Sequence, residues 1–139
     1  MAVVERAITA LSELAELPLD APERLVWERQ RLDEFRSGER EAFAMIYRAY
    51  SGLIYARILM PMLGRPSAAE DALADTFERA HAKLASFRLR DRSVFFWLGR
   101  IARNRALDMH RRHGVARHRE AMLSAHFDRL GIREPDPEA

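Results

Sequence analysis

Ser93-Val-Phe-Phe-Trp-Leu-Gly-Arg-Ile-Ala-Arg-Asn104 is the centre of the stretch, residues 67–119, around which this chain is organised. Aromatic and arginine side chains alternate in it at the spacing of a helix. The buried stripe expected for this helix is Val94, Trp97, Leu98, Ile101 and Ala102. Phe95 and Phe96 cannot both join that stripe, because successive helical residues lie about 100° apart. At least one aromatic ring is therefore expected at the surface, where it could stack on the bases of a polyanion.

The segment before this helix, Ser86-Phe-Arg-Leu-Arg-Asp-Arg-Ser93, has no helical period and is predicted to be a loop whose last residue caps the helix. Residues 88–119 hold ten arginines and two acidic residues, although the net charge of the whole chain is only +2. Residues 1–87 and 120–139 each have a net charge of −3. Such segregation of charge indicates a localised anionic partner.

The composition of the 139-residue chain favours one compact all-α domain with extra segments at its ends. Residues that favour helices predominate, and there are only six glycines and six prolines. The absence of cysteine excludes disulfides and thiolate chemistry. With no apolar run of about 18 residues and no signal peptide, the chain is expected to be cytoplasmic, without membrane insertion.

Two helices are expected before the first sharp turn of the chain. Apolar residues at helical spacing over residues 2–17 predict the first. The second is expected to have Asp20 as its N-cap, to run to about Ser37 and to stop at Gly38.

Two longer helices are expected next. From Glu39 onward, apolar residues fall on almost every side of the predicted helix, which is typical of a helix at the centre of a bundle. Pro61 is expected to kink or end this helix. Ser67-Ala-Ala-Glu70 predicts a capping box at the start of the following helix. Its inner face is expected to be Leu73, Phe77, Ala80 and Leu84. The acidic residues of its outer face are Asp71, Asp75 and Glu78. This acidic row is compatible both with simple solvation and with a binding surface.

Three histidines, His110, His113 and His118, follow the aromatic helix. No carboxylate or cysteine stands among them and the arginines between them would repel a cation, so no metal site is expected. Residues 120–130 are predicted to form a short helix that ends at Gly131, and residues 134–139 an acidic disordered tail. Because no paired carboxylates converge on a nucleophile and no glycine-rich phosphate loop is present, an enzyme is disfavoured.

Three strings, in this order and with these gaps, resemble region 2 of the extracytoplasmic-function sigma factors of bacterial RNA polymerase. They are Gly38-Glu-Arg-Glu-Ala-Phe43, Ala69-Glu-Asp-Ala-Leu-Ala-Asp-Thr-Phe77 and Trp97-Leu-Gly-Arg-Ile-Ala-Arg-Asn-Arg-Ala-Leu-Asp108. The resemblance covers residues 32–119. Residues 1–31 are more than the family needs and are expected to be a helical extension that packs against the domain, and residues 120–139 a short helix with an acidic tail. The resemblance implies a helical, non-catalytic promoter-recognition domain without a cofactor.

The resemblance assigns the acidic helix to the clamp helices of the polymerase β′ subunit. The polymerase-binding residues that it implies are Asp71, Asp75 and Glu78. Ala74 stands where the family commonly has glutamine, which removes a polar side chain from the middle of that surface.

The resemblance assigns the loop and the aromatic helix to opening of the minus-ten promoter element and capture of a flipped base of the non-template strand. The implied DNA-binding residues are Arg88, Arg90, Arg92, Phe95, Phe96, Arg100, Arg103, Asn104, Arg105, Arg111, Arg112, Arg117 and Arg119. Asn104 would lie near the base pocket, and the last four arginines would contact phosphates. Trp97 is expected in the core because it lies on the apolar stripe.

A complete factor of this family has a second domain, region 4, which reads the minus-thirty-five element, and no such sequence follows Arg119. The chain is accordingly expected to be an excised domain, a truncated product, or a stand-alone protein that works with a region-4 partner. The alternative to promoter opening is an interaction module, either a decoy or a split sigma subunit. Such a module would bind polymerase, an anti-sigma factor or a region-4 partner without opening DNA.

Overall fold

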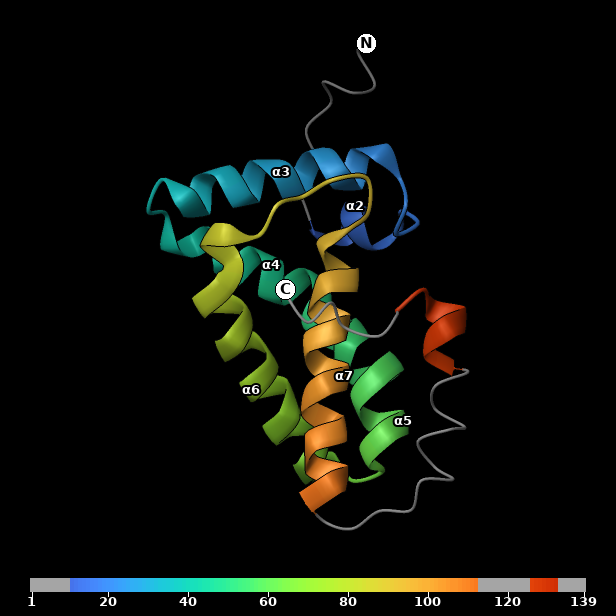
Figure 1. The fold of residues 1–139 in the computed structure, drawn as a ribbon. Helices are drawn as coiled ribbons and strands as arrows, with labels where there is room; N and C mark the ends of the chain where they lie inside the picture. The colour runs from blue at the N-terminus through green and yellow to red at the C-terminus, as the bar shows by residue number, and fades with distance from the viewer. Residues whose placement is uncertain (1–10, 113–125, 133–139) are drawn as a thin grey trace.

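The computed structural model describes residues 11–112 and 126–132, and every regular element among them is helical (Figure 1). The prediction of an all-α fold is therefore confirmed. The helices are α2 (Leu11–Ala15), α3 (Pro22–Arg36), α4 (Arg40–Ile54), α5 (Met60–Leu63), α6 (Pro66–Lys83) and α7 (Val94–Arg112). A π-helical turn, η1 (Tyr55–Leu59), joins α4 to α5, and a 3-10 turn, η2 (Leu84–Ser86), follows α6. Residues 126–130 form one further helical turn.

The described elements share one core. Figure 1 shows α6 and α7 side by side, with α3 lying across their upper ends. The large fully buried side chains at its centre are Tyr50, Ile54, Ile58, Phe95 and Leu98. Trp27 and Leu32 of α3 are buried in the same cluster, so the division expected between residues 31 and 32 falls inside a single helix. No helix in residues 11–112 or 126–132 is long and apolar enough to cross a membrane.

Prolines set the starts of α3 and α6, and the two predicted side-chain caps are wrong. Pro22 is the first residue of α3, and Asp20 makes no capping hydrogen bond. Pro66 is the first residue of α6, and Ser67 lies inside the helix instead of capping it. Proline suits this position because its φ is already helical and the N–H that it lacks would have no partner there. The predicted stop at Gly38 is confirmed by its φ of +97°.

Pro61 neither ends nor breaks the central helix, which continues through the π-helical turn into α5. Pro61 has no N–H to donate to the carbonyl oxygen of Arg57, four residues earlier. His126 Nε2 donates to that oxygen at 2.9 Å. On the other side of Pro61, His110 Nε2 donates to the carbonyl oxygen of Met62 at 2.6 Å. Two histidines distant in the sequence therefore satisfy carbonyl groups beside the proline.

Several expectations concern residues outside the described ranges. Of the helix expected over residues 2–17, the structure describes residues 11–17, and Leu11–Ala15 are helical. The helix expected over residues 120–130 is described from residue 126, and its predicted end at Gly131 is confirmed by a φ of +80°. The residues singled out above that lie outside are His113, Arg117, His118, Arg119 and the tail 134–139.

Candidate nucleic-acid interface

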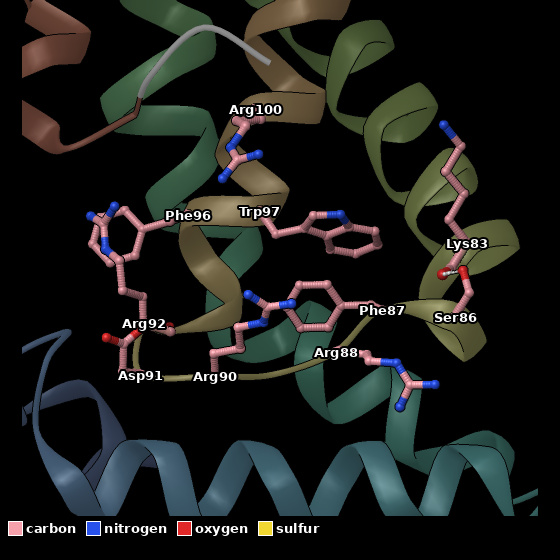
Figure 2. Close-up of a pocket in the computed structure, with 11 residues that line it drawn as sticks. Lys83, Ser86, Phe87, Arg88, Arg90, Asp91, Arg92, Phe96, Trp97 and Arg100 are labelled. Atoms are coloured by element: carbon pink, nitrogen blue, oxygen red, sulfur yellow. Dashed lines mark hydrogen bonds between the residues drawn. The ribbon is translucent and has the colours of Figure 1, made fainter. Parts of the chain in front are cut away.

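An open cavity of about 660 Å³ lies between the loop at residues 87–93 and the first turns of α7 (Figure 2). Its basic lining residues are Lys83, Arg88, Arg90, Arg92 and Arg100. Its aromatic lining residues are Phe87, Phe96 and Trp97, and Asp91 is the one acidic residue among the described residues that line it. Cations interleaved with aromatic rings are the combination that binds unpaired bases and their phosphates. The predicted loop is confirmed, and it forms one wall of this cavity.

Trp97 packs against the core but also lines this cavity, so the expectation of a core position is only partly correct. Its indole is half-buried and packs against the Phe87 ring, with 4.6 Å between centroids and 34° between planes. The two rings form a stacking platform (Figure 2). Phe87 was not among the sequence-predicted site residues. The signal that could have found it is its place in the arginine-rich loop, next to three alternating arginines.

Phe95 is fully buried, which corrects its assignment to the DNA-binding surface. Its side chain is 0% exposed and packs beside Tyr50 of α4, at 6.2 Å between ring centroids. Phe96 is half-buried and carries the Arg92 guanidinium 3.8 Å above its ring. Arg92 Nη1 also donates to the carbonyl oxygen of Gly131 at 3.2 Å. Of the two phenylalanines, only Phe96 lines the cavity.

The arginines of α7 lie in different surroundings. Arg100 lines the cavity, and Arg111 and Arg112 are exposed at the end of the helix. Arg103 is only 6% exposed, with its guanidinium 5.3 Å from the centroid of the Phe127 ring. Its assignment to the DNA-binding surface is therefore wrong, because Phe127 covers that part of α7.

Arg105 and Asn104 complete the predicted set. Asn104 is half-buried. Arg105 Nε donates to Asp75 Oδ2 of α6 at 2.7 Å, so one residue predicted to bind DNA and one predicted to bind polymerase are joined in an ion pair. This pair links α6 to α7.

The acidic row of α6 is open to solvent at Asp71 and Glu78, whereas Asp75 is partly covered by its ion pair. Ala74 is exposed between them. The inner face of α6 is formed by Ala69, Ala72, Thr76, Phe77 and Ala80, while Leu73 is only partly buried. Asp71, Ala74 and Glu78 therefore form one outward face of α6.

A buried polar cluster, formed by Arg24, Glu28, Tyr50 and Ser93, holds the start of α7. The Ser93 cap is confirmed, since its Oγ accepts a hydrogen bond from the backbone N–H of Phe95 at 3.1 Å. Ser93 Oγ donates to Glu28 Oε2 at 2.5 Å, and the N–H of Val94 donates to Glu28 Oε1 at 2.8 Å. The Glu28 carboxylate of α3 thus caps the start of α7, although Glu28 and Val94 are 66 positions apart in the sequence.

Tyr50 and Arg24 complete this cluster. The Tyr50 hydroxyl donates to Glu28 Oε2 and accepts from Arg24 Nη1 at 3.2 Å. Arg24 Nη2 also donates to the carbonyl oxygen of Leu14 at 2.6 Å, which ties α2 to α3. Burial is the main cause that raises the pKa of Glu28, opposed by its hydrogen bonds and the Arg24 charge. Burial, together with the Glu28 charge, also raises the pKa of Tyr50.

The raised pKa of Glu28 predicts an unusual pH dependence of stability. Between the ordinary value of 4.5 and the raised value, the folded chain binds more protons than the unfolded chain. The contribution of Glu28 to the free energy of unfolding should therefore increase as the pH falls through the raised pKa, and level off below 4.5. The gain is about 1.4 kcal/mol for each unit by which the pKa is raised.

Urea unfolding of the wild type and of Glu28→Gln over a pH series isolates this contribution. The variant keeps the side-chain shape but does not titrate. The unfolding free energy of the wild type minus that of the variant should increase as the pH falls. A difference that is constant, or that shifts the other way, contradicts the assignment.

Comparison with known proteins finds a family that matches the part of the chain that contains the cavity. The family described as Sigma-70 region 2 matches residues 46–115, which include α6, the loop and α7. The sigma factor BldN of Streptomyces coelicolor, an ECF RNA polymerase sigma factor, is 34% identical over 77 residues, which is 55% of this chain and 29% of the relative. SigW of Bacillus subtilis, with the same description, is 35% identical over 80 residues, 58% of this chain and 42% of the relative. The matched part thus spans less than half of either relative. No solved structure matches the chain significantly.

Proposed function

Because the chain belongs to the sigma-70 region 2 family, we propose that it binds core RNA polymerase and recognises and opens the minus-ten promoter element. Members of this family are transcription initiation factors and not enzymes. The observation that carries the proposal is the cavity of about 660 Å³ between the loop and α7, in which five cations surround the Phe87 and Trp97 platform. This cavity lies inside the matched residues. The function would be carried out in the cytoplasm.

The chemistry of the cavity suits an unpaired base better than a duplex. A flipped base offers an aromatic face that stacks on an indole or a phenyl ring, and each stacked base contributes about 1 to 3 kcal/mol. Arg88, Arg90 and Arg100 supply cations around the platform for the flanking phosphates. Arg111 and Arg112 extend the basic surface along α7, where contacts would add affinity without base preference.

The polymerase-binding surface that we propose is the outward face of α6. Asp71 and Glu78 are exposed there and would pair with basic residues of the β′ clamp helices. Asp75 would remain paired with Arg105 and would contribute to the polymerase interface by its place between Asp71 and Glu78. Because both surfaces lie on α6 and α7, which the Asp75–Arg105 pair joins, polymerase binding and DNA binding would take place on adjacent helices.

A second candidate is an interaction module that binds polymerase, an anti-sigma factor or a region-4 partner but does not open DNA. One observation favours it: Ala74, at the middle of the acidic face, presents no polar group. A module that does not open DNA would not use the basic cavity. Promoter opening is therefore the preferred function.

Transcription from a promoter library by the full chain and core RNA polymerase, with and without candidate region-4 proteins, distinguishes these functions. Permanganate reactivity of thymines measures opening. We expect a subset of promoters to become reactive in the minus-ten element only when the chain is present. Binding to polymerase with no reactive promoter under either condition would support the interaction module. Failure to bind polymerase would overturn promoter opening and leave only a module that binds an anti-sigma factor or a region-4 partner.

A further inference from the structure

The loop that forms one wall of the cavity runs alongside α3 (Figure 1). Residues 22–31 of α3 belong to the N-terminal extension, which was expected only to pack against the domain. Two side chains of α3 form hydrogen bonds with this loop, one at each end of it.

Arg36, in the last turn of α3, holds the start of the loop. Its Nε donates to the carbonyl oxygen of Ala85 at 3.3 Å, and its Nη2 donates to the carbonyl oxygen of Phe87. Phe87 is the residue whose ring stacks on Trp97. The Arg36 guanidinium therefore fixes the backbone that carries one ring of the platform. Asp33 Oδ1 lies 3.7 Å from Arg36 Nη1 and orients the guanidinium.

Glu28 holds the end of the same loop, two turns earlier in α3. Its carboxylate accepts hydrogen bonds from Ser93 Oγ and from the Val94 N–H, and it is completely buried. Eight residues of helix separate Glu28 from Arg36, a rise of about 12 Å. Because a helix is rigid, this spacing sets the distance between the two ends of the loop. The arginines between those ends line the cavity.

We propose that Glu28 and Arg36 are positioning residues through which α3 fixes the conformation of the loop at residues 87–93, which would read the base. The inference rests on the proposed function, since it assigns these residues to base discrimination. A loop held at both ends loses less conformational freedom when DNA binds, and its side chains meet one base at a defined geometry. Attraction of phosphates depends on charge and not on this geometry. Loss of an anchor should therefore reduce discrimination between bases more than it reduces overall affinity.

Arg36→Ala is the principal test, because Arg36 is exposed and its removal leaves no core cavity. The control is Arg29→Ala, which removes the same charge from an exposed position of the same helix. The full chain with core RNA polymerase first selects its preferred sequence from a randomised single-stranded DNA library. Dissociation constants are then measured for that sequence, for its single-base variants and for random DNA.

The wild type and Arg29→Ala should prefer the selected base by at least about fivefold at one position. In Arg36→Ala this preference should fall to about twofold or less, whereas affinity for random DNA stays within about twofold of the control. Arg36→Lys, which can donate to one carbonyl at a time, should restore part of the preference. Glu28→Gln, which keeps the shape of the buried side chain, should lose preference in the same way. Parallel losses on selected and random DNA would indicate a merely structural role and overturn the proposal.

Hydrogen exchange without DNA measures how firmly the loop is held, and the base preference of the wild type separates the two possible failures. The amides of residues 88–94 should exchange faster in Arg36→Ala than in Arg29→Ala. If the wild type shows no base preference, the proposed function fails, whatever the exchange rates are. If the wild type discriminates and Arg36→Ala discriminates equally, the positioning role fails while the proposed function stands.

Discussion

Reversing the charges of Asp71 and Glu78 together (Asp71→Arg, Glu78→Arg) should abolish binding of the chain to core RNA polymerase and leave its fold unchanged. Both side chains are exposed on the outward face of α6, so the substitutions disturb no buried contact. Placing like charges opposite each other at an interface adds repulsion to the loss of attraction. If these residues are interface anchors, the combined loss should exceed about 2 kcal/mol, or about 30-fold in affinity.

Asp75 is left unchanged in this experiment because its carboxylate pairs with Arg105 at 2.7 Å, and reversing it would disturb the packing of α7 against α6. The matched control is Glu16→Arg with Asp20→Arg, which makes the same change of net charge at two exposed residues away from α6. Affinity is measured by titration of labelled chain with core enzyme at two salt concentrations, and folding by circular dichroism. Wild-type affinity in the α6 variant, or an equal loss in the control, would remove α6 from the interface.

The sequence predicted the helical fold and the arginine-rich loop, but not which residues of the aromatic helix are buried. Five apolar residues follow one another from Val94 to Leu98, so more than one stripe fits the helical period. Contacts with other elements determine which of these five residues are buried. Tyr50 of α4 packs against Phe95 in the core, and Phe87 of the loop supports Trp97 at the cavity. Periodicity within one helix contains no information about these partners.

The buried charges were missed for a related reason. Glu28 looks like an ordinary exposed residue of α3 until its partners, 65 and 66 positions away, are brought beside it. Arg103 likewise reads as a surface cation, and only the approach of Phe127 covers it. Sequence patterns assign charged residues to the surface because an unpaired buried charge is costly. A buried charge with distant partners therefore cannot be recognised from local sequence.

Replacing Trp97 by alanine should reduce affinity for single-stranded minus-ten DNA by about 5-fold to 150-fold, which corresponds to the 1 to 3 kcal/mol of one stacked base. The reason is that the variant removes half of the platform formed with Phe87. Trp97→Phe keeps an aromatic plane against Phe87 and should retain most of the affinity. The measurement is a titration of a fluorescent single strand, selected from a randomised library, with the chain and core RNA polymerase.

Tyr47→Ala is the matched control, because Tyr47 is 40% exposed, packs against Phe77 and lies outside the cavity. It should lose affinity by less than about twofold, since it removes an aromatic ring that no base would meet. A thermal unfolding midpoint for each variant shows that the chain is folded at the assay temperature. If Trp97→Ala binds like Tyr47→Ala, the cavity attracts DNA by charge alone. In that case the Phe87 and Trp97 platform belongs to the packing of the loop, and base capture must be assigned elsewhere on α7.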